Sequence, residues 1–199
     1  MKELFIVEGV SAASTLNRSL DKTCQQVHAV QGKLINSVTA SVQSVLENDI
    51  CQQLINVLGC EPGDACDVQT LYFTKVLILC DPDIDGRHAS ALLMSFFSRY
   101  YRPIVEQEKL RLIKAPLFRV QMLGRDDQYA DTDAELAKIT NASHDAKVTR
   151  FKSIAQFSKA ECSQILLHPA TRREYVFNQP TASATVQVLK WFIIQPYKK

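Results

Sequence analysis

The sequence predicts an α/β domain, a mostly parallel sheet flanked by helices, followed by a smaller α+β tail region. Two segments, the apolar run Leu4–Val7 and Lys75–Cys80, which is apolar after its first residue, are typical of strands buried on both faces of a parallel sheet. Segments with helical periodicity follow both runs, and strands that alternate with helices are the pattern of an α/β fold. A composition of 46% hydrophobic and 22% charged residues over 199 residues allows a sizeable core.

The first predicted strand ends at Glu8-Gly9, and a helix is expected to begin just after it. Ser11 is the candidate N-cap of this helix, because a serine side chain can accept hydrogen bonds from the first turn. His28-Ala29-Val30 is a weaker candidate for the next strand.

The segment from Ser37 to Leu58 carries apolar residues at three- and four-residue steps, which predicts a helix. Asn48-Asp49 can divide this segment into two helices, and Gly59 is the expected C-terminal stop. Residues 60–69 contain Pro62 and Gly63 and are expected to form a loop.

An acidic segment, Asp81-Pro82-Asp83-Ile84-Asp85-Gly86, comes directly after the second apolar run. We expect residues 81–86 to be a loop and the next helix to cover about His88 to Tyr101. Residues 110–113 and 118–120 are expected to form a further pair of extended segments.

The character of the sequence changes near residue 124, so we divide the chain into residues 1–123 and a tail region, residues 124–199. The tail contains a candidate short helix at 133–139, a segment of weak helical periodicity at 148–167, and a strand-like apolar run at 185–194.

Charge and cysteine content narrow the class of protein. The net charge of +2 argues against a basic nucleic-acid tail or a polybasic membrane patch, although it leaves room for a local basic groove. The six cysteines form no C-x-x-C pair and no zinc-like spacing, so we expect reduced thiols, with Cys60 and Cys66 the closest pair. The short apolar run at the N-terminus fits neither a signal peptide nor a membrane span, which indicates a soluble, cytoplasmic protein.

Glu8 and Asp81 each follow a predicted parallel strand, so the sheet would bring both carboxylates to the same edge. Asp83 and Asp85 would lie on the adjacent loop, where Gly86 allows a tight turn. Four acids gathered on an apolar scaffold repel one another unless a cation is bound, and hard oxygen ligands suit Mg2+. Metal-assisted phosphoryl transfer is the chemistry that such a site best supports.

The acidic segment has two alternative interpretations. An EF-hand loop that begins at Asp81 would need a bidentate Glu where the chain has Leu92, and a strand precedes it instead of a helix. A solvated acidic turn that caps the next helix is the other alternative, and the matching Glu8-Gly9 after its own strand speaks against it.

A strand-end Glu combined with a D-x-D motif resembles the Toprim fold. The resemblance extends to the Toprim region of the B subunit of bacterial gyrase and topoisomerase IV, the type IIA DNA topoisomerases. The segments that carry it, in family order over about residues 3–123, are Leu4–Ala12, Gln31–Asn36, Glu47–Cys60, Asp81–His88, Leu92–Ile104 and Lys114–Val120.

In that family a tyrosine of a gyrase A-like partner subunit attacks DNA, and the Toprim acids hold Mg2+ at the phosphate. The resemblance implies that Glu8 is the catalytic general acid/base and a metal ligand. Asp81 and Asp83 would be the main Mg2+ ligands, and Asp85 would complete a second metal position or the outer shell. The implied DNA phosphate contacts, for which solvated surface charge is the alternative, are Lys33, Arg87, His88 and Arg99.

The chain departs from the family pattern in several places. The family's E-G-D-S-A-G-G stands here as Glu8–Ser14, with Val10, Ala13 and Ser14 in place of an Asp and two Gly. Residues 150–157 resemble the family motif R-[FY]-K-G-L-G-E-M, but both glycines and the Glu are replaced. No Gly-rich nucleotide-binding segment is present, so ATP would act only through a separate domain. The chain is either a fragment or, as the departures favour, a diverged short paralogue.

Three functions are compatible with these features. The first is an Mg2+-dependent DNA cleavage–religation module of a type II topoisomerase, an isomerase with DNA and a gyrase A-like subunit as partners. The second is a degenerate, non-catalytic Toprim module that binds DNA or a topoisomerase partner. A stand-alone Toprim nuclease or primase-like enzyme is the third, and the gyrase-type segments argue against it. The sequence leaves the oligomeric state open, a homo-oligomer included.

Overall fold

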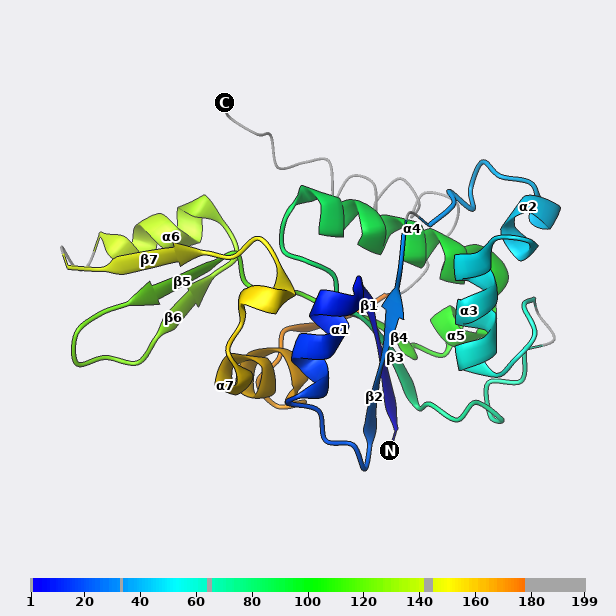
Figure 1. Ribbon diagram of the computed structural model, residues 1–199, viewed down its shortest axis with the longest axis horizontal. Helices are drawn as coiled ribbons and strands as arrows, with labels where there is room; N and C mark the ends of the chain where they lie inside the picture. Colours follow the sequence, from blue (N-terminus) through cyan, green and yellow to red (C-terminus); the bar gives the residue numbers. More distant parts are fainter. Residues whose placement is uncertain (1, 33, 64–65, 142–144, 178–199) are drawn as a thin grey trace.

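The computed structural model describes residues 2–32, 34–63, 66–141 and 145–177, which form two sheets with helices around them (Figure 1). The larger sheet has five strands and confirms the predicted α/β class. In their order across the sheet, the strands are β2 (Gln25–Val30), β1 (Glu3–Glu8), β3 (Lys75–Ile78), β4 (Leu110–Ile113) and β8 (Glu174–Val176).

The first four strands of this sheet run parallel, and only β8 is antiparallel to its neighbour β4. The register pairs Glu8 with Val30, so the last residues of β1 and β2 lie side by side. Because β3 is parallel to β1, its carboxyl end reaches the same edge, where ligands of open α/β sheets bind.

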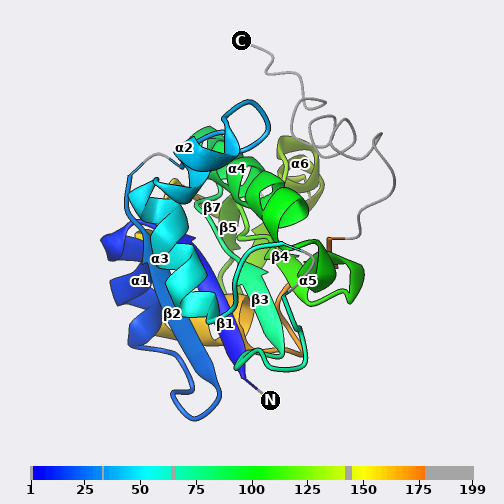
Figure 2. The same ribbon diagram turned by 90° about the vertical axis from the view of Figure 1, so that its right-hand side faces the viewer.

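Helices cover both faces of the large sheet (Figure 2). On one face, Leu4 and Ile6 of β1 pack against α3 (Asp49–Leu58), α4 (Ile84–Tyr100) and α5 (Arg102–Glu106). On the other face, Phe5 and Val7 pack against a second group of elements. These elements are α1 (Val10–Asn17), the 3-10 helix η1 (Ile154–Gln156) and the π-helix η2 (Cys162–Leu167), which directly follows the short helix α7 (Lys159–Glu161). Alternate residues of β1 therefore enter two separate cores, which explains why the strand is apolar throughout.

Two helix predictions are corrected by the structure. Ser11 does not cap α1: the N-cap is Gly9, at φ 80°, and Ser11 lies exposed within the helix. The predicted helix from Ser37 begins only at α2 (Val42–Leu46), because the Ser41 side chain accepts the Ser44 N–H and fixes the helix start there. The predicted division at Asn48 and the C-terminal stop at Gly59 are confirmed, since Asn48 caps α3 and Gly59 adopts a left-handed conformation.

The smaller sheet is antiparallel, in the order β6 (Gln128–Ala130), β5 (Phe118–Gln121) and β7 (Lys147–Arg150). Helix α6 (Asp133–Thr140) packs on it and confirms the predicted short helix. The predicted helical character of 148–167 is wrong for its first part, which is strand β7 paired with β5. The strand-like run at 185–194 lies outside the described residues.

The tail also contributes to the large sheet, because β8 pairs with β4 after the chain has left the smaller sheet. A boundary at residue 124 would fall between the paired strands β5 and β6. The change in composition near residue 124 therefore does not coincide with a boundary between the two sheets. The boundary near residue 124 stays a prediction.

Arg172 fastens this returning segment to the large sheet. Its side chain is 0% exposed, and its guanidinium donates to both Glu3 carboxylate oxygens at 2.6 and 2.7 Å. The same group also donates to Glu174 at 2.5 and 2.8 Å and to the Leu167 carbonyl at 3.1 Å. A buried cation is tolerated when it is paired and fully hydrogen-bonded in this way.

The expectation that all six cysteines are reduced is wrong for one pair, because Cys60 and Cys66 form a disulfide. Gly63, at φ 115°, lets the chain reverse between them, and their Cα atoms lie 5.7 Å apart. The Gly63 N–H donates to the Tyr100 carbonyl at 2.7 Å, which ties this loop to α4. The other four cysteines are free thiols, as expected.

Across the described residues, no helix is both long enough and apolar enough to cross a membrane.

Candidate metal centre

Glu8 lies at the carboxyl end of β1, half-buried at the edge of the sheet. The turn after it depends on Gly9, whose φ of 80° favours glycine and whose N–H donates to the Val30 carbonyl at 2.8 Å. Burial raises the pKa of the Glu8 carboxyl, and the neighbouring charges of Asp81, Asp83 and Asp85 raise it further. Glu8 therefore lies within the electrostatic reach of the other three acids.

Asp81 follows β3 and is held by a segment from the tail. Its Oδ1 accepts the Ile154 N–H at 2.7 Å, and the Ser153 side chain lies beside the same carboxylate. Burial raises the pKa of Asp81, although the hydrogen bonds from Ile154 and Ser153 oppose this shift. The carboxylate is thus fixed in direction by groups that lie 72 and 73 positions along the chain.

The expectation that Asp85 and Gly86 lie on a loop is wrong, because α4 already begins at Ile84. Asp83 is the N-cap of this helix and accepts the Gly86 N–H at 3.0 Å, and Asp85 lies in the first helical turn. Both carboxylates are favourably placed, since the positive end of the helix dipole attracts negative charge.

Gly86 is needed for close packing and not for a turn. A Cβ atom on this residue would lie 2.2 Å from the Asp81 carbonyl oxygen and 2.6 Å from its nitrogen. The first turn of α4 therefore rests directly on the backbone of Asp81, which brings the D-x-D acids together.

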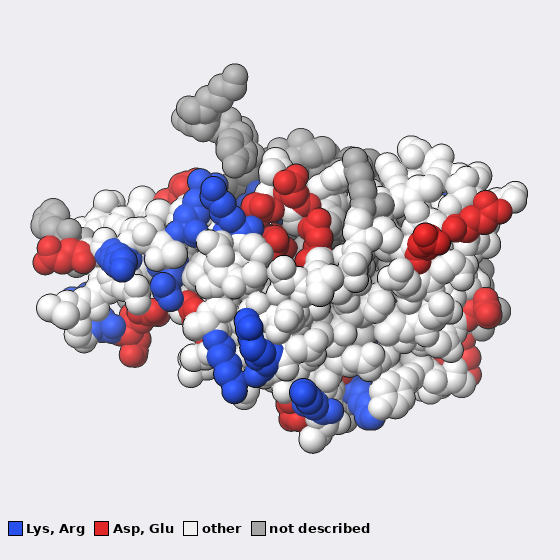
Figure 3. Space-filling view, viewed as in Figure 1, with Lys and Arg blue, Asp and Glu red and all other residues white. Residues whose placement is uncertain are grey.

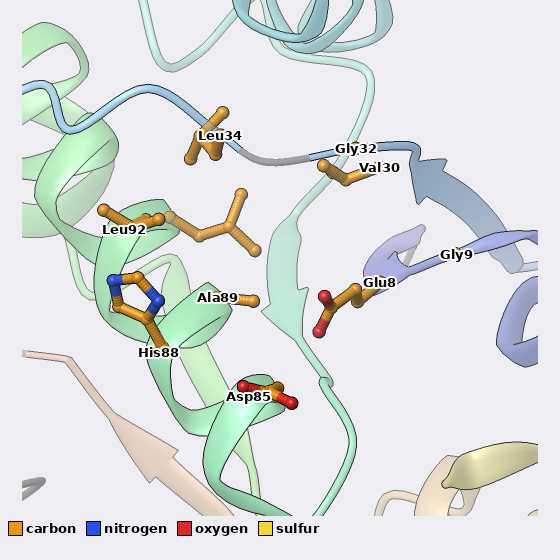
Figure 4. Close-up of a pocket in the computed structure, with 10 residues that line it drawn as sticks. Glu8, Gly9, Val30, Gly32, Leu34, Asp85, His88, Ala89 and Leu92 are labelled. Atoms are coloured by element: carbon orange, nitrogen blue, oxygen red, sulfur yellow. The ribbon is translucent and has the colours of Figure 1, made fainter.

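A pocket of about 490 Å³ opens beside these acids. The carboxylates of Glu8 and Asp85 lie toward one end of it, and Leu34 and Leu92 lie toward the other (Figure 4). Its remaining lining residues are Gly9, Val30, Gly32, His88, Ala89 and Leu93.

The carboxylates at this edge of the sheet fit a Mg2+ ion that keeps part of its water shell. Within the described ranges, no three Asp, Glu, His or Cys side chains converge closely enough to enclose a metal ion. Mg2+ keeps several waters, however, and commonly takes only one or two protein carboxylates. Glu8 at the end of β1 and the acids at the start of α4 supply carboxylate oxygens from separate elements, so the residues fit a hydrated Mg2+ and not an all-protein cage.

Comparison with known proteins places this arrangement in a family. The model of the Toprim domain matches residues 3–114, which include β1 to β4 and all four acids. The chain belongs to the Toprim domain family.

Type IIA topoisomerase B subunits are homologous to nearly the whole chain. The B subunit of DNA gyrase from Metamycoplasma arthritidis is 30% identical over 197 residues, 97% of this chain and 31% of that protein. The B subunit of DNA topoisomerase 4 from Pseudomonas aeruginosa is 32% identical over 193 residues, 94% of this chain and 30% of that protein. The B subunit of DNA gyrase from Halalkalibacterium halodurans is 33% identical over 175 residues, 86% of this chain and 27% of that protein. The chain thus spans about a third or less of the length of these relatives.

The candidate DNA contacts of this Toprim domain occupy different settings. Arg87 and His88 lie in the first turns of α4, beside the acids, and His88 lines the pocket. Arg99 lies at the far end of the same helix, where its guanidinium donates to the carbonyls of Ser37, Val38 and Ala40. Its observed contacts therefore hold the loop before α2, and Lys33 lies outside the described residues.

The surface around the Toprim acids also carries positive charge. Acidic side chains gather over the start of α4, and a group of basic side chains lies beside them toward the end of β7 (Figure 3). Arg150 and Lys152 are exposed in this part of the chain. A phosphate backbone would meet both signs of charge here.

Sequence reasoning missed Ser153 and Ile154 as part of the acidic site. The available signal was the similarity of Arg150–Phe157 to the motif R-[FY]-K-G-L-G-E-M. The residues replaced within that motif gave no indication of a contact with the acids. The structure shows that this segment contacts Asp81 directly.

Proposed function

We propose that this chain is the Mg2+-dependent DNA cleavage–religation module of a type II DNA topoisomerase. It would act in the cytoplasm with a gyrase A-type subunit that supplies the attacking tyrosine. The observation that carries the proposal is the placement of Glu8 and Asp81 at neighbouring strand ends, with Asp83 and Asp85 at the start of α4. Homology to gyrase and topoisomerase IV B subunits supports the reaction type.

The proposed chemistry assigns separate tasks to the acids. The partner's tyrosine gives its proton to solvent and its oxygen attacks the phosphorus, a phosphotyrosine ester forms, and the bond from phosphorus to the 3′-oxygen breaks. Glu8 gives its proton to the departing 3′-oxygen and takes it back on religation, a role that a carboxyl with a raised pKa performs well. Asp81 and Asp83, with Glu8, would hold Mg2+, which supplies positive charge at the phosphate when bound.

Binding of DNA would draw on the positive charge beside the acids. Arg87 and His88 directly follow the acidic segment, and a basic group lies beside the acidic side chains toward β7. Lys33 and Arg99 remain candidate phosphate contacts of this proposal. ATP-driven strand passage would need a separate domain.

Covalent trapping tests the proposal. The chain is mixed with the gyrase A protein, supercoiled plasmid and Mg2+, and detergent and protease then reveal linear DNA from broken strands. We expect Mg2+-dependent linear DNA, reduced by about 10²–10⁴-fold in Glu8→Gln, the range for loss of a general acid. Glu106→Gln, an exposed glutamate of the surface ion pair with Arg102, is the matched control and should cleave normally. No cleavage above the Glu8→Gln level would refute the proposal.

A non-catalytic Toprim module is the second candidate. The observation that favours it is that no three metal-ligating side chains converge among the residues placed by the structure. It predicts retention of plasmid DNA or of the gyrase A protein by the chain, with identical binding and no cleavage in wild type and Glu8→Gln. Trapped cleavage products would exclude it.

A further inference from the structure

The tail segment that contacts Asp81 is built as a rigid turn. Ser153 and Gln156 form a capping box around η1: the Ser153 Oγ accepts the Ala155 N–H at 3.2 Å, and the Gln156 Oε1 accepts the Ser153 N–H at 3.0 Å. Gln156 Oε1 also accepts the Lys152 N–H at 2.6 Å. The direction of the Ile154 N–H, which lies inside this turn, is therefore set by side chains and not by a long helix.

The turn is also fixed to the core on both sides. The rings of Phe151 and Phe157 stack with their centroids 4.0 Å apart. Ile154, which lies between these residues in the sequence, has a fully buried side chain. These three side chains share a core with Ala13 and Leu16 of α1. A turn anchored in this way cannot move far without opening the core.

Asp81 is held between this turn and α4. The Ile154 N–H donates to its Oδ1 at 2.7 Å, and the Ser153 side chain, whose Oγ accepts the Ala155 N–H, lies beside the same carboxylate. On the backbone side, Gly86 packs against the carbonyl and nitrogen of Asp81. Both the backbone and the carboxylate of Asp81 are therefore constrained.

We infer that the turn Ser153–Gln156 is the positioning element for Asp81, with Ser153 as a positioning residue that aims this carboxylate at the bound cation. The inference rests on the proposed function, since it concerns the same acids. The hydroxyl is a departure from the motif that residues 150–157 resemble, which has glycine at this position. Outer-shell partners of this kind orient carboxylate ligands, and their removal commonly costs about 10–100-fold in metal affinity.

A second capping box supplies the matched control. Ser158 and Glu161 repeat the arrangement of Ser153 and Gln156 one turn later, and the Ser158 Oγ accepts the Glu161 N–H at 3.2 Å. Ser158→Ala therefore removes an equivalent cap, whose two hydrogen bonds join Ser158 to Glu161. Ser153→Ala removes both the cap of the turn and the hydroxyl beside the Asp81 carboxylate, whereas Ser153→Thr keeps a hydroxyl in place.

The test is calorimetric titration of MgCl2 into the full 199-residue chain and the three variants, each first shown to be folded by circular dichroism. We expect Ser153→Ala to weaken Mg2+ binding about 10-fold, the lower end of the outer-shell range because the Ile154 N–H remains. Ser158→Ala and Ser153→Thr should bind like the wild type.

Equal Mg2+ affinity in Ser153→Ala and Ser158→Ala would overturn this inference and leave the proposed function standing. A wild-type chain that binds no Mg2+ would overturn both the inference and the metal part of the proposed function. A Ser153→Ala chain that is unfolded while Ser158→Ala is folded calls for Gln156→Ala, which loosens the turn and keeps the hydroxyl. Wild-type affinity in folded Gln156→Ala would then overturn the positioning role, and a loss in affinity would support it.

Discussion

Gly86→Ala is expected to destabilise the protein, although the same change inside most helices is stabilising. Alanine normally gains about 1 kcal/mol over glycine in a helix interior. Here the added Cβ would lie 2.2 Å from the Asp81 carbonyl oxygen, and ordinary contact begins at 3.4 Å. The start of α4 must therefore retreat by about 1 Å from the backbone of Asp81, a residue that follows strand β3 and whose carboxylate is held by the Ile154 N–H.

Overpacking of this kind costs about 1–3 kcal/mol, and contact with backbone atoms leaves little room for relaxation. We expect a net loss of about 2 kcal/mol in the free energy of unfolding, which lowers the melting temperature by about 4–8 °C for a chain of this size. Urea unfolding followed by circular dichroism measures the loss. Ile84→Ala, at an exposed position of the same helical turn, is the control and should change stability by less than about 0.5 kcal/mol. A Gly86→Ala protein as stable as the wild type would refute the packing argument.

Three further predictions follow from the fold. Arg172→Met should lower the free energy of unfolding by about 3–5 kcal/mol in urea denaturation, because it leaves the buried Glu3 carboxylate without its partner; an unchanged midpoint would contradict this. Reduction of the Cys60–Cys66 disulfide should cost about 2 kcal/mol, the loop-closure value for so short a loop, and the same titration with and without reductant measures it. Glu8→Gln should stabilise the metal-free protein at neutral pH. Because the folded-state pKa of Glu8 lies above its unfolded value, wild-type stability is lost as pH rises through the raised pKa, and thermal melts from about pH 4 to about pH 8 should show a flatter profile in the variant.

The elements that depend on local pattern could be predicted from the sequence. The apolar runs at Leu4–Val7 and Lys75–Cys80 form the buried strands β1 and β3, and Asn48 and Gly59 mark the ends of α3. These features depend on side-chain periodicity and on capping, both of which are local in the sequence.

Three features of the structure depend on tertiary contacts that the local sequence pattern does not indicate. The local sequence suggests a turn at Gly86. It does not show that α4 packs on the backbone of Asp81, which is the reason a glycine is needed there. Ser153 and Ile154 could not be assigned to the site, because their contact with Asp81 joins segments more than 70 residues apart. The Cys60–Cys66 disulfide likewise depends on a chain reversal at Gly63 that spacing alone does not require.

The acidic site itself could be predicted in part. The sequence indicates which strand ends carry Glu8 and Asp81, and the parallel register places those ends at one edge. It offers a helix-capping acidic turn only as an alternative, and it does not indicate that Asp83 is the cap or that Asp85 lies within the helix, since helix starts depend on which side chain accepts the first free N–H groups.

The proposed cleavage reaction depends on Mg2+ binding by the acids, and this binding can be measured directly. Calorimetry compares the wild type with Asp81→Asn, Asp83→Asn and, as the control, Asp133→Asn, an exposed aspartate in the first turn of α6. We expect the wild type and Asp133→Asn to bind Mg2+ equally and Asp81→Asn and Asp83→Asn to lose this binding. Equal binding in all four proteins, or none in the wild type, would contradict this expectation.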